Sequence, residues 1–429
     1  MKYSFDVLIA GSGVAGLYCA LNLREDLRAL VISKTDLRET NTYLAQGGIS
    51  TAKDNSDVGL FIEDTMKAGG YENNHSAVNI LARESISNIK ELVNYGLNLD
   101  ENPAGTGLSY TREGAHSVNR IVHCKDQTGK AVAETLIAEA QKRDNIELWE
   151  NTSLMELMKK GNKCVGGILV KDGAAIRVFS KAVVMATGGI GGLFKDSTNQ
   201  RTMTGDGLAI ALKNNIRLKN LGYIQFHPTG FYTRENNSRR FLISESLRGE
   251  GARLYNSRGE RFVDELLPRD KVSDAINKEL KKEKLPYVFL DITALKKSYI
   301  RHRFPAIYQE CLKQGVDITS EPIPVSPTQH YFMGGIEVNL NGETSMKNLY
   351  AAGETACTGV HGTNRLASNS LLEGLVFSRR AAMHINEIID SVAEEQPDSC
   401  SWDLSLDREN LIKELKRSND RLYDELFCS

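Results

Sequence analysis

A glycine fingerprint near the N-terminus constrains the fold of this chain more than any other feature. The apolar run Phe5–Ala10 predicts a strand, and Gly11-Ser12-Gly13-Val14-Ala15-Gly16 follows it directly. In this pattern the first Gly permits a tight turn, the second lets the backbone approach a pyrophosphate, and the next helix presents its positive end. A helix over about Val14–Arg24 and a strand at Ala29–Ile32 would complete the required βαβ unit. The N-terminal region is therefore predicted to bind a dinucleotide.

Length and composition are those of an ordinary soluble protein with two or three domains. The chain has 429 residues, 41% hydrophobic and 25% charged, which indicates neither disorder nor a membrane span. Its net charge is −2, so there is no global attraction to nucleic acid. The apolar start contains the glycine fingerprint and lacks a cleavage site, so we expect a cytoplasmic protein without a signal peptide.

The cysteines give no sign of a metal site. No C-x-x-C pair is present that could hold zinc or an iron–sulfur cluster. We expect reduced, mostly buried thiols. The seven positions are Cys19, Cys124, Cys164, Cys311, Cys357, Cys400 and Cys428.

The fingerprint alone does not separate FAD from NAD. An NAD site usually has an acidic residue at the end of the second strand, but this chain has Ser33-Lys34 there. Lys34 is better suited to phosphate or to polar ribityl oxygens. Three further glycine-rich turns, Asn41–Gly48, Ala186–Gly189 and Ala352–Glu354, suit the length of FAD. FAD is the predicted cofactor.

The order of the elements predicts an α/β fold with an interrupted first domain. Short apolar runs with glycine turns over Ile146–Phe179 indicate an antiparallel meander, which leads into a buried strand at Ala182–Gly189. Helices are expected over Ser76–Tyr95 and from Thr128. We predict a Rossmann-like FAD-binding domain from residues 1–220 and 331–390, an α+β capping domain at 221–330, and a short C-terminal helical segment at 391–429.

The C-terminal segment is charged and carries apolar residues at helical spacing. Leu411, Leu415, Leu422 and Leu426 fall on one face of a predicted helix. The simplest interpretation is a helix docked on the body of the protein, and partner binding is the alternative.

Several motifs together resemble one flavoprotein superfamily. They are Ala45-Gln46-Gly47-Gly48, Phe226–Thr229, Leu247–Ala252, His330-Tyr331 and His361–Glu373. From Phe5 to about Ile389 the chain resembles the superfamily of succinate dehydrogenases, fumarate reductases and L-aspartate oxidases. That resemblance implies a flavin held against a small dicarboxylate.

Two positions distinguish the branches of this superfamily. Respiratory dehydrogenases usually carry a histidine, covalently bonded to the flavin, where this chain has Asn41. The segment Arg112-Glu113-Gly114-Ala115-His116-Ser117 resembles the Arg-Glu-Gly-Gly-His-Ser of the L-aspartate oxidase branch except at Ala115. This resemblance implies noncovalent FAD and oxidation of L-aspartate to iminoaspartate, with O2 or fumarate as acceptor. It also implies the first step of NAD biosynthesis via quinolinate, with quinolinate synthase consuming the product.

Two other functions remain open at this point. One is a soluble fumarate reductase or a succinate dehydrogenase-type flavoprotein subunit that docks on an iron–sulfur partner. Glu113 argues against it, because a carboxylate would repel a substrate without an ammonium. The other is a flavin-binding module without turnover, which would not require substrate-binding groups.

The resemblance also implies roles for particular residues. His330 and Arg365 would bind the α-carboxylate, and His227 with Ser244 the side-chain carboxylate; the branch usually has threonine at the position of Ser244. Glu113 would face the ammonium, and Arg269 is the family's acid/base group. A guanidinium has a pKa above about 12 and is a poor base, so orientation of the substrate would be its larger contribution. The catalytic candidates are Arg269, Glu113, His227, His330 and Arg365.

The cofactor candidates come from the glycine turns and their neighbours. Asp206 opens a predicted helix and either caps it or lies at the cofactor, and the resemblance implies the latter. Glu354 is expected on ribityl hydroxyls, while Ser370 and Leu371 offer backbone N–H groups to the flavin. Arg248 is expected to be structural, and His116 and His361 could either support the site or act in it. The full set is Gly11, Ser12, Gly13, Val14, Ala15, Gly16, Ser33, Lys34, Asn41, Thr42, Ala45, Gln46, Gly47, Gly48, Ala186, Thr187, Gly188, Asp206, Glu354, Asn369, Ser370 and Leu371.

Overall fold

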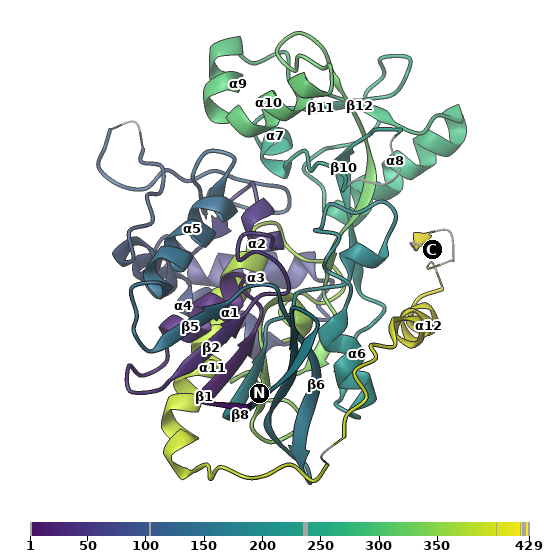
Figure 1. The fold of residues 1–429 in the computed structure, drawn as a ribbon. Coiled ribbons are helices and arrows are strands. Elements are labelled where there is room, and N and C mark those ends of the chain that lie inside the picture. The colour runs from purple at the N-terminus through teal and green to yellow at the C-terminus, as the bar shows by residue number, and fades with distance from the viewer. Residues whose placement is uncertain are drawn as a thin grey trace.

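A sheet built around the N-terminal strand forms the base of the molecule (Figure 1). The computed structural model describes residues 2–102, 104–234, 239–399, 401–420, 422, 426 and 427. Strand β1 (Lys2–Ala10) lies between β2 (Ala29–Ile32) and β8 (Ala174–Met185) and is parallel to both. Strand β5 (Ile146–Trp149) pairs with β2, and β15 (Leu349–Ala351) with the end of β8, also in parallel. The predicted α/β fold is confirmed.

The meander extends the same sheet on its other side. Strands β6 (Thr152–Lys160), β7 (Lys163–Lys171) and β8 pair in antiparallel order. The prediction that the meander begins at Ile146 was wrong, because that residue starts β5, which belongs to the parallel part. Short apolar runs indicate strands but do not say which neighbour each strand pairs with.

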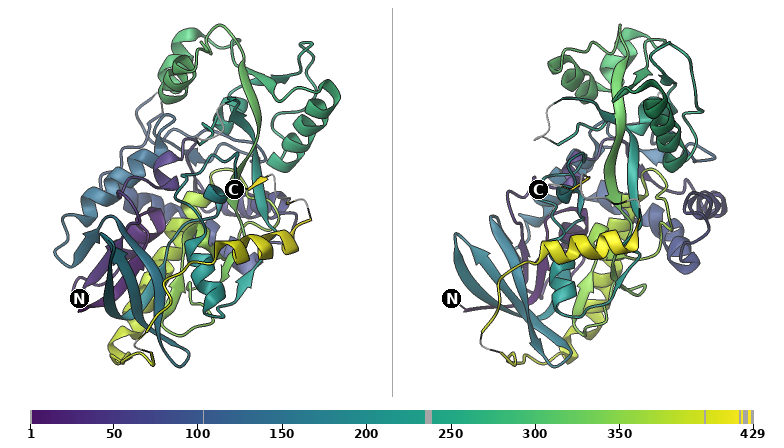
Figure 2. Two further views of the ribbon diagram at one scale, coloured as in Figure 1. Left: turned by 45° about the vertical axis from the view of Figure 1, so that its right-hand side comes forward. Right: turned by 90° about the vertical axis from the view of Figure 1, so that its right-hand side faces the viewer.

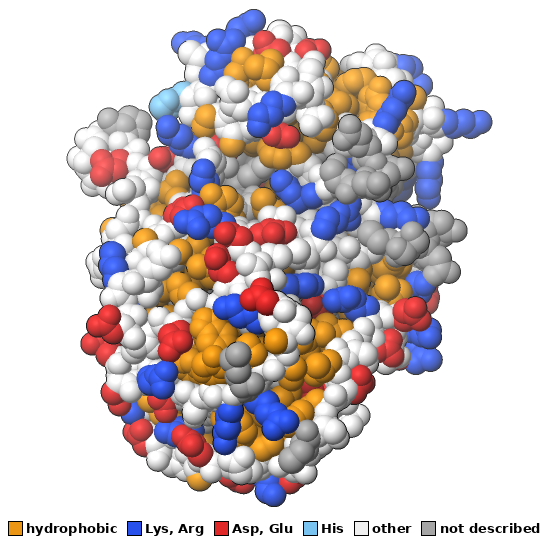
Figure 3. Space-filling view, viewed as in Figure 1, with side chains coloured by type: hydrophobic (Ala, Val, Ile, Leu, Met, Phe, Trp, Pro, Cys, Tyr) orange, Lys and Arg blue, Asp and Glu red, His pale blue; other side chains and the backbone are white. Residues whose placement is uncertain are grey.

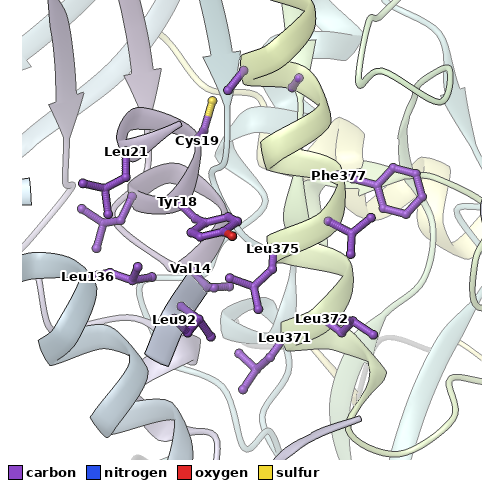
Figure 4. Packing of buried hydrophobic residues seen from close by; sticks show 14 of the residues in the cluster. Val14, Tyr18, Cys19, Leu21, Leu92, Leu136, Leu371, Leu372, Leu375 and Phe377 are labelled. Carbon is purple, nitrogen blue, oxygen red and sulfur yellow. The ribbon is translucent and has the colours of Figure 1, made fainter. Parts of the chain in front are cut away.

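Helices cover one face of the sheet and enclose the main core. Helix α1 (Val14–Leu21) packs against α11 (Asn369–Ile388), and α5 (Thr128–Ala140) and α4 (His75–Asn94) lie beside them. Figure 4 shows side chains of α1 and α11 pointing toward one another. Helix α1 ends earlier than predicted, at Leu21, and the Asn22 side-chain amide that follows donates to the carbonyl of Tyr18.

Smaller elements complete this part of the chain. Helix α2 lines the cleft described below, strand β3 pairs with β4, and a small sheet of β9, β14 and β16 lies near α6. Their bounds are α2 Asn41–Leu44, β3 Ile49–Ser50, α3 Val58–Ala68, β4 Ile121–Val122, α6 Asp206–Lys213, β9 Leu218–Lys219, β14 Gly335–Glu337 and β16 Ala356–Cys357, with 3-10 turns at Gly191–Leu193, Gly353–Thr355 and Ile389–Ser391.

A second antiparallel sheet carries its own hydrophobic core at the other end of the molecule (Figure 1). Its order is β10-β13-β12-β11, and helices α7 to α10 accompany it. Residues of this core all lie within 231–325, inside the predicted capping region 221–330. The exact domain boundaries stay a prediction. The bounds are β10 Ile224–Phe231, α7 Glu245–Gly249, β11 Arg253–Tyr255, α8 Arg269–Glu283, β12 Val288–Asp291, α9 Lys297–Arg303, α10 Pro305–Lys313 and β13 Ile323–Phe332.

The C-terminal helix docks on the body of the protein. Helix α12 (Arg408–Ser418) buries Leu411 and Leu415 completely against the α6 side of the sheet. The predicted single helix through Leu422 and Leu426 was wrong, because extended backbone at Asn419 ends α12. Leu422 and Leu426 still join the same hydrophobic cluster.

The charged side chains on the surface and the free thiols agree with the composition of the chain. On the face seen in Figure 3, acidic and basic side chains are interspersed. Within the described ranges, no helix combines the length and apolar character needed to cross a membrane. Cys19, Cys164, Cys311 and Cys357 are free and buried, and Cys124 is free and partly exposed; Cys400 and Cys428 lie outside the described residues.

Candidate active site

One cleft runs from the glycine fingerprint to the second sheet. Its walls bring together the ends of β1, β2 and β8, the turn at Gly353, the start of α11, and residues of β10, β13, α7 and α8. Of the predicted cofactor residues, those that line the cleft are Gly11, Ser12, Gly13, Val14, Ala15, Ser33, Lys34, Asn41, Thr42, Ala45, Gln46, Gly47, Gly48, Ala186, Thr187, Gly188, Asp206, Glu354, Ser370 and Leu371.

Two predicted cofactor residues do not line the cleft. A side chain at Gly16 would lie 1.9 Å from the Gly11 carbonyl oxygen, so this glycine permits close packing of α1 on the turn. Asn369 is buried, accepts a hydrogen bond from Ser50 and donates one to Thr65. Both residues lie behind the cleft lining, and their assignment to the cofactor site stays a prediction.

The fingerprint forms a backbone cradle at one end. Gly11 has φ +125°, and a Cβ there would lie 2.0 Å from the carbonyl oxygen of Ala186. Gly13 is the N-cap residue of α1 and has no side chain, so the N-terminal end of the helix faces the cleft. Thr42 accepts from the Val14 backbone N–H at 2.9 Å. This arrangement suits a pyrophosphate.

Lys34, two residues after β2, carries a charge that is already paired. Lys34 Nζ donates to Asp206 Oδ2 at 2.8 Å and to the hydroxyl of Thr204 at 3.0 Å. Asp206 starts α6 and lines the cleft. The carboxylate missing from the end of β2 is therefore supplied by another element.

Polar side chains of Gln46, Glu354 and Asn41 line the middle of the cleft. The side-chain oxygen of Gln46 is buried and has no partner among the described residues. Glu354 accepts from the Phe332 backbone N–H at 3.0 Å, and burial raises its pKa to about 7. Asn41 donates to Asn199 at 3.0 Å and accepts from the Gln200 N–H at 2.9 Å. The cradle, the buried Gln46 oxygen and these polar side chains fit FAD.

All six predicted substrate residues line the far end of the same cleft. They are Glu113, His227, Ser244, Arg269, His330 and Arg365. The rings of His227 on β10 and His330 on β13 have centroids 5.0 Å apart. Paired antiparallel strands therefore bring together two histidines that lie far apart in the sequence.

The hydrogen bonds of His227 define its open ring nitrogen. The Thr229 backbone N–H donates to Nδ1 at 3.2 Å, while Nε2 is buried and has no partner in the described part of the chain. Burial, together with the positive charge of Arg269, holds the pKa of His227 well below its usual range. A neutral ring with Nδ1 accepting carries its proton on Nε2, so His227 presents one free donor to a carboxylate.

Glu113 is the acidic group of the substrate end. The Ser368 hydroxyl donates to it at 2.6 Å, and a Cβ at Gly47 would lie 2.3 Å from its other carboxylate oxygen. Burial and the nearby Glu245 raise its pKa. The absence of a side chain at Gly47 leaves room for this carboxylate beside the cofactor-binding turn.

Arg269 is held in place by a residue that the sequence reasoning did not select. Its Nε donates to Glu245 at 2.5 Å and its Nη1 to Gln225 at 2.9 Å. Arg248 lies 3.4 Å from the same Glu245 carboxylate, so it is structural as expected. Glu245 lies between Ser244 and the Leu247–Ala252 motif, and this position in the sequence could have indicated a role in the site.

Arg365 lines the cleft, whereas the nearby His361 lies outside the cleft lining. The guanidinium of Arg365 stacks 4.3 Å from the centroid of the Tyr331 ring and donates to Ser370 at 2.7 Å. Burial and the charge of Arg269 lower its pKa to about 10. His361 bonds to Glu373 at 2.8 Å outside the cleft lining, and it supports this region.

His116 also supports the site from behind. Its Nε2 lies 2.9 Å from the carbonyl oxygen of Ala367, and its Nδ1 lies 3.2 Å from Arg120. Burial lowers its pKa to about 4. Neither contact places it on the cleft wall.

The fold and the cleft define an FAD-binding flavoprotein, and a family model described as "FAD binding domain" matches residues 6–371. The chain is 52% identical over 430 residues to an L-aspartate oxidase of Clostridium perfringens, covering 99% of this chain and 98% of that protein. It is 56% identical over 396 residues to an L-aspartate oxidase of Clostridium acetobutylicum, covering 92% and 91%. The chain belongs to the L-aspartate oxidase family, and FAD is its cofactor.

Solved structures agree with this assignment. The FrdA chain of Escherichia coli quinol fumarate reductase superposes with a TM-score of 0.86 at 28% identity, covering 97% of this chain and 74% of that one. Mycobacterium smegmatis Sdh1 gives 0.78 at 33% identity, covering 97% and 72%. The fold is that of the superfamily flavoproteins.

Proposed function

We propose that the protein oxidises L-aspartate to iminoaspartate, with electrons passing to FAD. The observation that carries this proposal is the convergence of cationic and neutral donors with the buried carboxylate of Glu113 at the end of the cofactor cleft. An amino dicarboxylate brings two negative charges and one positive charge, so its site needs two sets of donors and one acceptor.

The donors divide into two sets. His330 and Arg365 would bind the α-carboxylate, and His227 with the Ser244 hydroxyl would bind the side-chain carboxylate. Thr198 supports this arrangement, because its hydroxyl lies 2.7 Å from Nδ1 of His330 and steadies that ring. Binding both ends of the substrate would orient its Cα toward the cofactor cleft.

Glu113 would receive the ammonium. Oxidation of an amine requires the Cα–H bond to break with its electron pair while nitrogen loses a proton. FAD, when bound, supplies the two-electron acceptor for that hydride. The raised pKa of Glu113 supports a role in accepting the proton from nitrogen, since its basicity is closer to neutral pH than that of an exposed glutamate.

Arg269 would orient the substrate rather than act as a base. Its guanidinium is fixed by Glu245 and Gln225 at the cleft wall. A fixed positive charge stabilises negative charge that develops near Cα and Cβ. The fumarate-reductase alternative is not favoured, because Glu113 would lie buried opposite a substrate without an ammonium.

The noncovalent state of FAD and the fate of electrons and product are further parts of the proposal. Asn41 supports noncovalent FAD, because an amide cannot replace the histidine that bonds to flavin in respiratory dehydrogenases. O2 or fumarate would reoxidise the flavin. The imine hydrolyses readily, so it needs an enzyme that consumes it. Quinolinate synthase would be that enzyme, and this functional link would place the reaction first in NAD biosynthesis.

An anaerobic assay tests the choice of substrate. Purified protein with FAD is mixed with L-aspartate or with succinate, and reduction of the flavin is followed by absorbance. L-Aspartate should bleach the flavin, while succinate should leave it oxidised. Reduction by succinate without a response to L-aspartate would overturn the proposal.

A further inference from the structure

The C-terminal helix reaches the cofactor cleft through one arginine. Arg408 is the first residue of α12, and its Nε donates to Asp206 Oδ1 at 2.9 Å. Its Nη2 lies 2.9 Å from the same oxygen. Asp206 lines the cleft, so an element about two hundred residues away in the sequence contacts a residue of the cofactor site.

The carboxylate of Asp206 is held from both sides. Oδ1 accepts from Arg408 and from the Thr204 hydroxyl at 2.7 Å, while Oδ2 accepts from Lys34 at 2.8 Å. Each carboxylate oxygen offers about two acceptor positions, and within the described ranges Oδ2 accepts from Lys34 alone, so one position on Oδ2 remains open. Because Ser33 and Lys34 follow β2 where an acid is usual, this position of Asp206 is where a ribose hydroxyl of the nucleotide would find an acceptor.

Helix α12 is itself fixed in place by packing. Leu411 and Leu415 are fully buried, and a Cβ at Gly205, immediately before Asp206, would lie 2.5 Å from the Leu411 side chain. Lys213 at the end of α6 also contacts the Asp403 carboxylate at 3.1 Å. Figure 2 shows α12 in yellow lying against α6. The position of Arg408 is therefore set by a packed core.

We propose that α12 forms part of the FAD-binding apparatus, with Arg408 as a positioning residue that fixes Asp206 for the nucleotide end of the cofactor. The C-terminal segment would then govern FAD retention without contacting the substrate end. Arg408 is partly exposed, so its contribution is moderate. This inference rests on FAD as cofactor and is independent of which substrate the enzyme oxidises.

The test is the dissociation constant of FAD. Apoprotein prepared from wild type, Arg408→Ala and Arg408→Lys is titrated with FAD, and binding is followed by flavin fluorescence. Arg408→Ala should weaken FAD binding about fivefold or more, and Arg408→Lys should give an intermediate value because a single charge can reach Asp206. The KM for L-aspartate at saturating FAD should stay the same.

A matched control uses the other end of α12. Within the part of the chain that the structure describes, Arg417 pairs with Glu414 of its own helix at 2.6 Å, and Arg417→Ala should leave FAD binding unchanged. The thermal midpoint of the apoprotein should be similar in all variants. An unchanged FAD dissociation constant in Arg408→Ala, or equal weakening in Arg417→Ala, would overturn the inference. Failure to oxidise L-aspartate would refute only the proposed substrate.

Discussion

At the scale of single residues, the substrate end depends on buried charges that offset one another. Glu113, Glu245, Arg269 and Arg365 are all nearly inaccessible to water. Removing one member of such a set leaves another uncompensated in a medium of low dielectric constant. Activity should therefore respond strongly to changes that keep the size of a side chain and alter only its charge.

Replacing Glu113 by glutamine tests the ammonium contact. Glu113→Gln should lower kcat/KM for L-aspartate by roughly a hundredfold, because the variant keeps the Ser368 contact and loses the negative charge. Fumarate reduction by the reduced enzyme should suffer less, since fumarate has no ammonium. Glu101→Gln, at an exposed position, is the control. Equal losses in both reactions would remove the proposed role of Glu113.

The raised pKa of Glu113 also predicts a pH dependence. Burial, then Glu245, shifts the pKa upward, so the carboxylate is lost at a higher pH than in an exposed glutamate. kcat/KM for L-aspartate should fall as the pH is lowered through this pKa and level off above it. Anaerobic flavin reduction measured across the acidic and neutral range checks this. A similar acidic limb in Glu113→Gln would assign it to another group.

At the scale of elements, the packing of α1 on α11 connects the cofactor cradle to the core. Both helices begin at the cleft, and Gly374 lies against Val14 so closely that a Cβ there would be 2.7 Å from its side chain. Tyr18 and Leu375 are buried between the helices (Figure 4). Loss of packing here should therefore affect stability and FAD binding together.

Leu375→Ala tests this packing. Leu375 is fully buried, so the change should lower the free energy of unfolding by about 2–5 kcal/mol. Urea unfolding followed by circular dichroism measures the effect. Met383→Ala on the same helix removes a side chain that is 49% exposed, and it should cost less than about 0.5 kcal/mol. Similar losses in the two variants would contradict a packed interface at Leu375.

At the scale of the whole molecule, the cleft is bounded by two parts with separate hydrophobic cores, and polar contacts join them near α9 and α10. Asp126 accepts from the Ile307 backbone N–H at 2.8 Å, near the start of α10. Arg303 donates to the Lys125 carbonyl at 2.5 Å. These contacts join the cofactor-binding part to the second sheet and its helices.

Loosening that junction should affect substrate binding more than cofactor binding. Asp126→Ala removes the acceptor at α10, so we expect a KM for L-aspartate about three- to tenfold higher and faster hydrogen exchange at the start of α10. The dissociation constant of FAD should not change, because Asp126 does not line the cleft. Asp144→Ala, at an exposed position, is the control. Loss of FAD in Asp126→Ala with normal KM would contradict this division.

Much of the fold and site follows from local patterns. Strand Phe5–Ala10 with its glycines, the turns at Asn41–Gly48 and Ala186–Gly189, and the histidine motifs all predicted groups that line one cleft. Such patterns are readable because turn conformation and hydrophobic period depend on neighbouring residues. Contacts between distant residues leave no such local mark.

The tertiary structure decided which distant groups meet. The pairing of β5 with β2, the contact of Lys34 with Asp206 across 172 residues, and the position of Glu245 beside Arg269 all depend on how whole elements dock. The same holds for α12, whose apolar residues indicated a docked helix but not its contact with Asp206. Docking is set by the summed packing of many side chains. The amino-acid sequence by itself therefore indicates the cofactor and its motifs. The assembled core determines which distant residues contact those motifs.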